Sequence, residues 1–228
     1  MTKTVLVVAA HPDDEVLGCG GTLARHVAEG DIVHAVFMTD GVSSRGKGND
    51  NAIKSRLEAA DKAHKIIGIS CSEYLTFPDN SLDTVPLLDI VRSIEEVIEK
   101  FAPQIVYTHN QADLNIDHCI THRAVMTSCR PLPGCSVREI YSFEVMSSSE
   151  WSPFSENVFT PKMYKDISPY IDLKMAALQA YRLEMRNAPH ARSMEHLRAL
   201  ATHRGHSVGV EYAESFVVER LIERAKGN

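Results

Sequence analysis

Residues 4–21 read TVLVVAAHPDDEVLGCGG, and this stretch decides the fold. Its first seven residues, 4–10, form a continuous apolar run rich in valine, which is typical of a strand buried on both faces of a sheet. Residues of helical character follow to about Glu29, where Gly30 ends them. A buried strand, a polar turn and a helix predict the first unit of an α/β fold.

The same alternation continues through the first half of the chain. The apolar and turn patterns predict strands over 33–39, 73–77 and 105–108, and helices over 52–67, 87–101 and 118–129. Strands that alternate with helices of this length form βαβ units with right-handed crossovers. The fold class expected is therefore α/β, with a mostly parallel sheet flanked by helices.

The second half of the chain is less regular. It predicts a strand over 139–145, a loop-rich stretch over 147–166, helices over 170–186 and 193–204, and a closing strand over 215–218. We find no internal repeat, no low-complexity segment and no linker. The sequence therefore predicts a single domain over 1–228 with a less regular C-terminal part.

Composition excludes several classes of protein. The formal net charge is −6 and no long run of Lys or Arg occurs, which argues against binding to nucleic acid or to an anionic membrane. No apolar stretch approaches the ~20 residues of a membrane helix, and the apolar N-terminal run is too short for a signal peptide. The five cysteines are odd in number and scattered, so we expect reduced thiols, a cytoplasmic location and no membrane insertion.

Polar side chains that can carry chemistry follow each of the first four strands. They are His11, Asp13, Asp14 and Glu15 after the first, Thr39, Asp40 and Arg45 after the second, Asp79 and Asn80 after the third, and His109, Asn110, Asp113, Asn115, Asp117 and His118 after the fourth. Ligands of open α/β sheets bind outside the carboxyl ends of the strands. Two histidine–carboxylate clusters far apart in sequence are thus predicted to share one edge of the sheet.

The first strand-to-helix turn favours a cation over a dinucleotide. A phosphate site needs its glycines directly after the strand, but Gly18, Gly20 and Gly21 come late, and carboxylates stand where phosphate would bind. Carboxylates with imidazole are typical of zinc rather than magnesium. Capping of the helix explains one aspartate of the turn, but it does not explain the whole cluster.

A catalytic zinc ion typically has three protein ligands and one open position. His11 and Asp14 can supply two of them, and the segment 115–118 after the fourth strand is the best-placed source of the third. His122, one helical turn after His118, is a second choice because it lies further from the strand end. His26, His34 and His64 fall away from the sheet edge and are interpreted as structural.

These motifs resemble those of the PIG-L/LmbE-like de-N-acetylases. That family includes N-acetylglucosaminyl-phosphatidylinositol deacetylases and the deacetylases of mycothiol and bacillithiol biosynthesis. The resemblance covers most of the chain in the family's order, in the segments Ala10–Gly21, Arg56–Glu58, Pro78–Asp79, Asp117–His118, Arg204–Gly205 and Tyr212–Phe216.

The resemblance implies a Rossmann-like fold with zinc on His11, Asp14 and His118. It further implies that Asp13 is the general base in hydrolysis of the N-acetyl group of a small acetamido-sugar substrate. These roles agree with the placement of the residues, which by itself left open which aspartate binds the metal. A zinc-bound water has a pKa of about 7, so a neighbouring carboxylate can take its proton at neutral pH.

One position departs from the family pattern. Many members carry a histidine that stabilises the oxyanion three residues before the third ligand, and here that position is Asn115. An amide can donate a hydrogen bond but cannot carry charge, and loss of one oxyanion donor typically costs about 2.7–4 kcal/mol. His109, His203 and His206 are alternative sources of that donor. Arg56 and Asp79 are predicted to contact the substrate.

Rival functions stay open at this stage. An amidase acting on a thiol-sugar conjugate would keep the metal and change the substrate, and a non-enzymatic Rossmann-type binding module would keep only the fold. A metal-dependent phosphohydrolase normally has more carboxylate ligands and uses magnesium. Substrate choice is expected to depend on the loops 40–51 and 147–166, and a homo-oligomer is compatible with such a domain.

Overall fold

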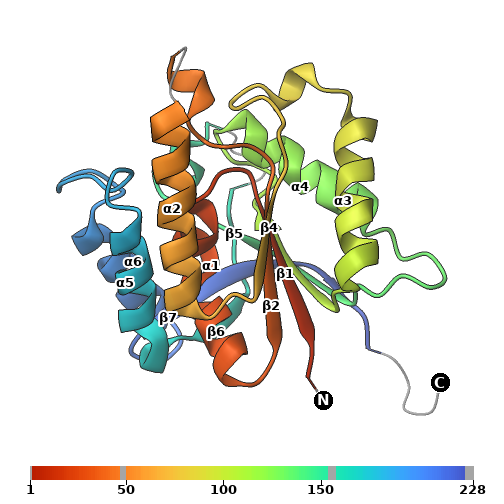
Figure 1. Cartoon of the computed structure of the whole chain (residues 1–228). Helices are drawn as coiled ribbons and strands as arrows, with labels where there is room; N and C mark the ends of the chain where they lie inside the picture. Colours follow the sequence, from red (N-terminus) through yellow and green to blue (C-terminus); the bar gives the residue numbers. More distant parts are fainter. Residues whose placement is uncertain (1, 47–49, 154–157, 224–228) are drawn as a thin grey trace.

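The computed structural model describes residues 2–46, 50–153 and 158–223, so parts of the two predicted specificity loops, 47–49 and 154–157, lie outside it. Figure 1 shows a central sheet between two layers of helices. The strands are β1 Thr4–Ala9, β2 Ile32–Phe37, β3 Cys71–Tyr74, β4 Ile105–His109, β5 Glu139–Phe143, β6 Met163–Asp166 and β7 Ala213–Leu221. The helices are α1 Asp14–Ala28, α2 Asp50–Ile67, α3 Leu87–Phe101, α4 Ile116–Ser128, α5 Ile171–Ala180 and α6 Met194–His206.

The strand order of the sheet is β3-β2-β1-β4-β5-β7-β6. The first five strands in this order pair in parallel, while β7 is antiparallel to both β5 and β6. The fold class predicted from the sequence is confirmed: this is a single α/β domain with a mostly parallel sheet. Because β1 lies between β2 and β4, the turns that follow β1 and β4 lie side by side at the carboxyl edge.

Helices bury both faces of the sheet. Alternate residues of β1 point to opposite faces: Val5 and Val7 belong to the core under α1, α2, α5 and α6, and Leu6 and Val8 belong to the core under α3 and α4. All four side chains have no exposed surface. This two-sided burial is the reason that the first strand is apolar from Val5 to Ala9.

The second half of the chain contains two departures from the predicted elements. The stretch 147–166 was predicted as loop, but its last residues form the edge strand β6, because they pair with β7. The helix predicted over 170–186 ends at Ala180. Beyond it, the buried Tyr181 anchors the chain, and the backbone N–H of Arg186 donates to the carbonyl of Arg192 as the segment turns back.

Helix α1 is broken at Cys19, whose backbone φ is −144°. Glu214 of β7 accepts hydrogen bonds from the N–H groups of Gly21 and Thr22 after the break, and Lys174 of α5 donates to the Leu17 carbonyl before it. The Lys174 Nζ and Glu214 Oε1 atoms are 2.6 Å apart and buried. This ion pair satisfies the backbone groups that the break leaves open.

Within residues 2–46, 50–153 and 158–223, no helix is both long enough and apolar enough to cross a membrane.

Candidate metal centre

The turn between β1 and α1 carries two of the predicted ligands. The backbone N–H of His11 donates to Asp14 Oδ2 over 2.9 Å, and the ring Nδ1 of His11 lies 3.1 Å from the same oxygen. Both side chains are buried. The short connection between strand and helix thus brings an imidazole and a carboxylate into contact at the carboxyl edge of the sheet.

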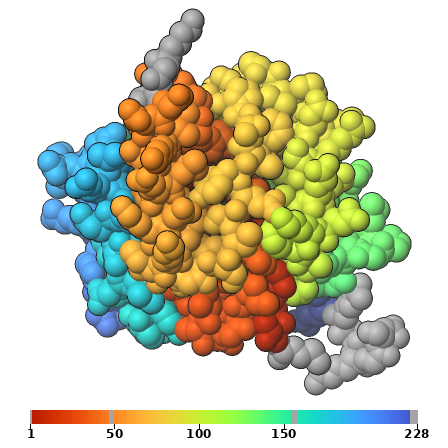
Figure 2. All heavy atoms as spheres, viewed as in Figure 1, coloured from red at the N-terminus to blue at the C-terminus, as the bar shows by residue number. Residues whose placement is uncertain are grey.

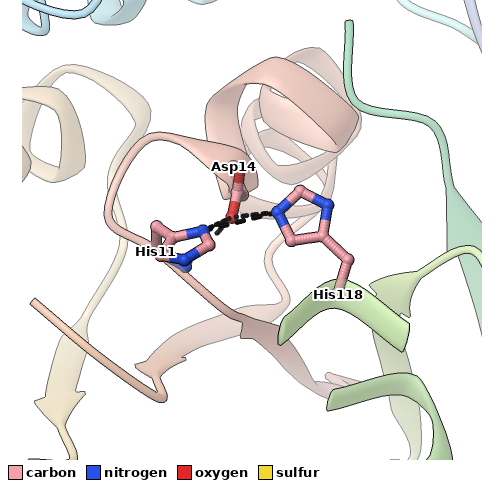
Figure 3. A group of neighbouring side chains, drawn as sticks. All are labelled: His11, Asp14 and His118. Atoms are coloured by element: carbon pink, nitrogen blue, oxygen red, sulfur yellow. Dashed lines mark hydrogen bonds and ion pairs between the residues drawn. The ribbon is translucent and has the colours of Figure 1, made fainter. Parts of the chain in front are cut away.

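His118 reaches the same point from the first turn of α4. Its Nε2 lies 3.3 Å from Asp14 Oδ2 and 3.4 Å from His11 Nδ1. Figure 3 shows both imidazole rings turned toward the carboxylate of Asp14. One atom from each of the three residues lies within 4.8 Å of the others, so the structure brings the three predicted ligands together. His11, Asp14 and His118 are named the metal group.

Each of the two histidines has a carboxylate beside its other ring nitrogen. Asp117 Oδ2 lies 3.3 Å from His11 Nε2, and Asp113 Oδ1 lies 3.2 Å from His118 Nδ1. Such partners fix the orientation of metal-binding histidines. Asp117 could also have been the cap of α4, but that place is taken by Asn115, whose Oδ1 accepts the backbone N–H of Asp117 over 2.8 Å.

A second group that could hold a cation consists of His11, Asp79 and Asp117. It is the poorer site because both carboxylates already accept hydrogen bonds. The donors to them are Thr39, Ser44, Asn80 and Leu82. In contrast, Asp14 Oδ1 is buried and has no hydrogen-bond partner in the described chain. An unsatisfied buried carboxylate oxygen is costly unless a cation or another ligand completes it.

The pKa values of these three residues also indicate that the cluster is suited to a cation. Burial alone would lower the pKa of His11, but hydrogen bonds with Asp117 and Asp14 outweigh it and raise that pKa to about 9. For His118, burial is likewise outweighed, by the charges of Asp14 and Asp113, and the pKa rises to about 10. The pKa of Asp14 falls well below its ordinary value, although burial opposes this, because of the charge on His118. The cluster is thus built to surround positive charge, and its two nitrogens and one oxygen fit zinc.

Asp13 lies beside this group in a strained backbone conformation, with φ at 142°. Its N–H donates to Glu15 Oε2 over 3.0 Å, and its Oδ2 lies 3.1 Å from both Arg56 Nη1 and Arg192 Nη1. Burial raises the pKa of Asp13 against the pull of the two arginines. A buried carboxylate with a raised pKa beside a metal group has the properties of a general base.

The family of this chain follows from a comparison with known proteins. Residues 6–129 match the PIG-L family, whose model is described as GlcNAc-PI de-N-acetylase. The chain belongs to the PIG-L family. Several of its relatives are named as deacetylases and the family is one of hydrolytic N-deacetylases, so this PIG-L chain is an enzyme of that class.

Individual relatives agree with this assignment. The chain is 34% identical to the uncharacterized deacetylase YaiS of Escherichia coli (strain K12), over 79% of this chain and 91% of the relative. It is 23% identical to a probable N-acetyl-alpha-D-glucosaminyl L-malate deacetylase 2 of Bacillus anthracis, over 78% of this chain and 80% of the relative. The crystal structure of a conserved protein from Thermus thermophilus, TT1542, superposes with a TM-score of 0.78 at 28% identity, over 100% and 99% of the two chains.

In this PIG-L protein the two predicted substrate contacts, Arg56 and Asp79, are buried and paired within the chain. Arg56 donates to the carbonyls of Pro12 and Gly41, over 2.7 and 3.1 Å. Asp79 Oδ1 lies 3.4 Å from His11 Nε2. Both residues therefore contact the turn that carries two of the predicted ligands and the predicted base.

Asn115 and His109, two candidates for the oxyanion donor, also make hydrogen bonds within the protein. Asn115 Nδ2 donates to Asn80 Oδ1 over 3.2 Å, in addition to its bond at the start of α4. His109 is fully buried, stacks on His118 at 3.9 Å between ring centroids, and accepts the backbone N–H of Ala10 at Nε2. Burial also lowers the pKa of His109 well below its ordinary value, so this ring is neutral. His203 and His206, the other two alternatives, are exposed on α6.

Sequence reasoning missed two residues of the site, Arg192 and Glu184. Arg192 binds Asp13 and also donates from Nε to Ser147 Oγ over 2.6 Å, while Glu184 Oε2 lies 3.1 Å from Arg56 Nη2. Both belong to the segment after α5, where no strand end or motif marks them. Only the fold of that segment over the βα turn brings them to the site.

Proposed function

We propose that this PIG-L protein is a zinc-dependent hydrolase that removes the N-acetyl group from an acetamido sugar or a conjugate of one. The observation that carries the proposal is the meeting of His11, Asp14 and His118, with the buried Asp13 beside them. Relatives of the chain that are named as deacetylases of acetylated sugars support the substrate class.

The residues that would hold zinc are His11 and Asp14 from the first turn and His118 from α4. Asp14 Oδ1, which has no hydrogen-bond partner among the described residues, and the carboxylates behind both imidazoles support this assignment. When bound, zinc supplies a Lewis acid for the acetamide carbonyl and lowers the pKa of a water to about 7.

Asp13 is the group that moves protons in this proposal. Its carboxylate takes a proton from the attacking water and passes it to the amine that leaves. Arg56 and Arg192 hold its Oδ2, which leaves the other oxygen, Oδ1, for the proton. Because burial raises the pKa of Asp13, the proton is held more readily than on an exposed aspartate.

Arg56 and Asp79 are proposed to contact the substrate, and Asn115 is proposed to donate a hydrogen bond to the oxyanion. The contacts within the chain add to this. Arg56 positions the base, and Asp79 lies against the ligand His11. Asn115 would have to release Asn80 before its Nδ2 could donate to an oxyanion. An amidase acting on a thiol-sugar conjugate would use the same residues, so only the substrate distinguishes it.

The test is acetate release by the zinc-loaded protein from N-acetylated sugars, nucleotide sugars and thiol glycosides. Asp13→Asn should retain stoichiometric zinc and lose about 10²–10⁴-fold in turnover, because the amide cannot accept the proton. The matched control is Asp89→Asn, an exposed aspartate of α3 outside the metal group. Full activity of Asp13→Asn would remove Asp13 as base, and a purified protein that neither binds zinc nor responds to a chelator would refute the proposal.

A further inference from the structure

Asp13 has an unusual backbone conformation for a residue other than glycine. Its φ is 142°, whereas the other three described non-glycine residues with positive φ lie between 44° and 69°, near the left-handed helical region. Such a conformation persists only where the surrounding structure holds it. Because Asp13 is the proposed base, the groups that hold its backbone also set the direction of its carboxylate.

Glu15 binds the backbone of Asp13. Its Oε2 accepts the Asp13 N–H over 3.0 Å, while the Asp13 carbonyl accepts the N–H groups of Val16 and Leu17 over 3.1 and 2.9 Å. A glutamate in the first turn of a helix often reaches back in this way to the N–H group of the cap residue. That role uses one oxygen and leaves the other to water. Glu15 has no exposed surface, so its second oxygen must be satisfied within the protein.

The second oxygen of Glu15 is held by two distant side chains. The Tyr181 hydroxyl donates to Oε1 over 2.6 Å, from a position 166 residues further along the chain, and His64 Nε2 lies 3.2 Å from the same atom. Ser72 Oγ lies 2.6 Å from His64 Nδ1, on the other side of the ring. Burial raises the pKa of Tyr181 well above its ordinary value, so the hydroxyl keeps the proton that it donates.

These two donors come from elements that pack against each other and against α1. His64 lies in α2, and Tyr181 directly follows α5. Figure 2 shows α2, in orange, beside the light-blue segment that follows α5. Both side chains are buried. A chain of buried hydrogen bonds therefore links the packing of α2 and α5 to the backbone of Asp13.

We propose that Tyr181 and His64 are positioning residues that act through Glu15, and that the three side chains together hold the strained backbone of Asp13 and aim its carboxylate at the metal group. The inference rests on the proposed function, in which Asp13 is the base. It gives a role in the reaction to His64, which the sequence alone indicates to be structural. The proton transfer stays with Asp13, and the positioning residues exchange no proton with the substrate.

The experiment is a double-mutant cycle on the zinc-loaded protein, with an N-acetylglucosaminide that the wild type deacetylates. Tyr181→Phe removes only the hydroxyl, so kcat should fall about three- to tenfold while KM and zinc content stay unchanged. In the Asp13→Asn background the same substitution should cause no further loss, because the base through which it acts is gone. The matched control, Tyr107→Phe, removes another buried hydroxyl, 2.9 Å from His26 Nε2, and should leave kcat unchanged.

Three results would overturn the inference while leaving the deacetylase intact. They are an unchanged kcat in Tyr181→Phe, an equal loss in both backgrounds, and an equal loss in the control. If Tyr181→Phe does not fold, His64→Leu takes its place in the cycle with the same expected result, since leucine keeps an apolar contact with the stacked ring of Phe37. Full activity of Asp13→Asn, or no acetate release by the wild type, would refute the proposed function, and the positioning role would fall with it.

Discussion

The two halves of the chain contribute different parts of the site. All three residues of the metal group come from the parallel half, at the carboxyl ends of β1 and β4, which are neighbours in the sheet. Asp13 is contacted from both halves, since Arg56 of α2 and Arg192 of the segment after α5 each lie 3.1 Å from its Oδ2. The parallel half thus supplies the whole candidate metal cluster, whereas the C-terminal half adds a second guanidinium group beside the candidate base.

The largest effect should follow removal of a metal ligand from the parallel half. His118→Ala should lower zinc affinity by more than the about 10–100-fold typical of an outer partner, because one of three ligands is gone. Zinc titration against a competing chelator measures this. His122→Ala, one helical turn further along α4, is the matched control and should keep its zinc. The reverse result would show that the third ligand is misassigned.

A smaller loss of zinc should follow a change behind the ligand. Asp113→Asn retains the shape beside His118 Nδ1 but removes the negative charge that faces it at 3.2 Å. Zinc affinity should fall about 10–100-fold, as measured by the same titration. Asp83→Asn, an exposed aspartate of the segment Leu82–Thr84, serves as the control. An unchanged affinity in Asp113→Asn would show that this carboxylate does not act through His118.

A change in the C-terminal half should spare the metal and slow the reaction. Arg192→Ala removes one of the two guanidinium groups on Asp13 Oδ2, so kcat should fall about tenfold with zinc content unchanged. Arg186→Ala is the control from the same segment, since the Arg186 guanidinium donates to the nearby carbonyls of Leu183 and Met185. Loss of zinc from Arg192→Ala would contradict the view that the C-terminal half does not contribute to zinc binding.

The smallest effect concerns the stability of the metal-free protein. The pKa values of His11 and His118 are raised from 6.5 to about 9 and 10, so the stabilisation that their protons give is complete below about pH 6.5 and is lost as the pH rises through 9 to 10. After chelator treatment, the Tm should therefore fall between pH 7 and pH 10. Added zinc should reduce this fall, because the metal replaces the protons. A Tm of the metal-free protein that rises over this range would contradict the assignment.

Much of the parallel half was predictable because its signals are local. The apolar run of β1 and the polar residues after each strand gave the fold class and the edge at which His11, Asp14 and His118 meet. The boundaries of the C-terminal half were less predictable: β6 forms through pairing with β7, and α5 stops at Ala180 where Tyr181 is anchored by Glu15. Neither cause is visible in the neighbouring sequence.

Residue type and spacing by themselves determined which side chains could bind a metal, since imidazole and carboxylate groups at strand ends have few other uses in such number. Tertiary structure alone decided which other side chains contact them. It gave the cap of α4 to Asn115 and placed Asp117 beside His11. It also brought Arg192 to Asp13 from 179 positions away. The physical reason is that spacing along the chain fixes local hydrogen bonds, whereas contacts between distant segments depend on how helices pack over the sheet.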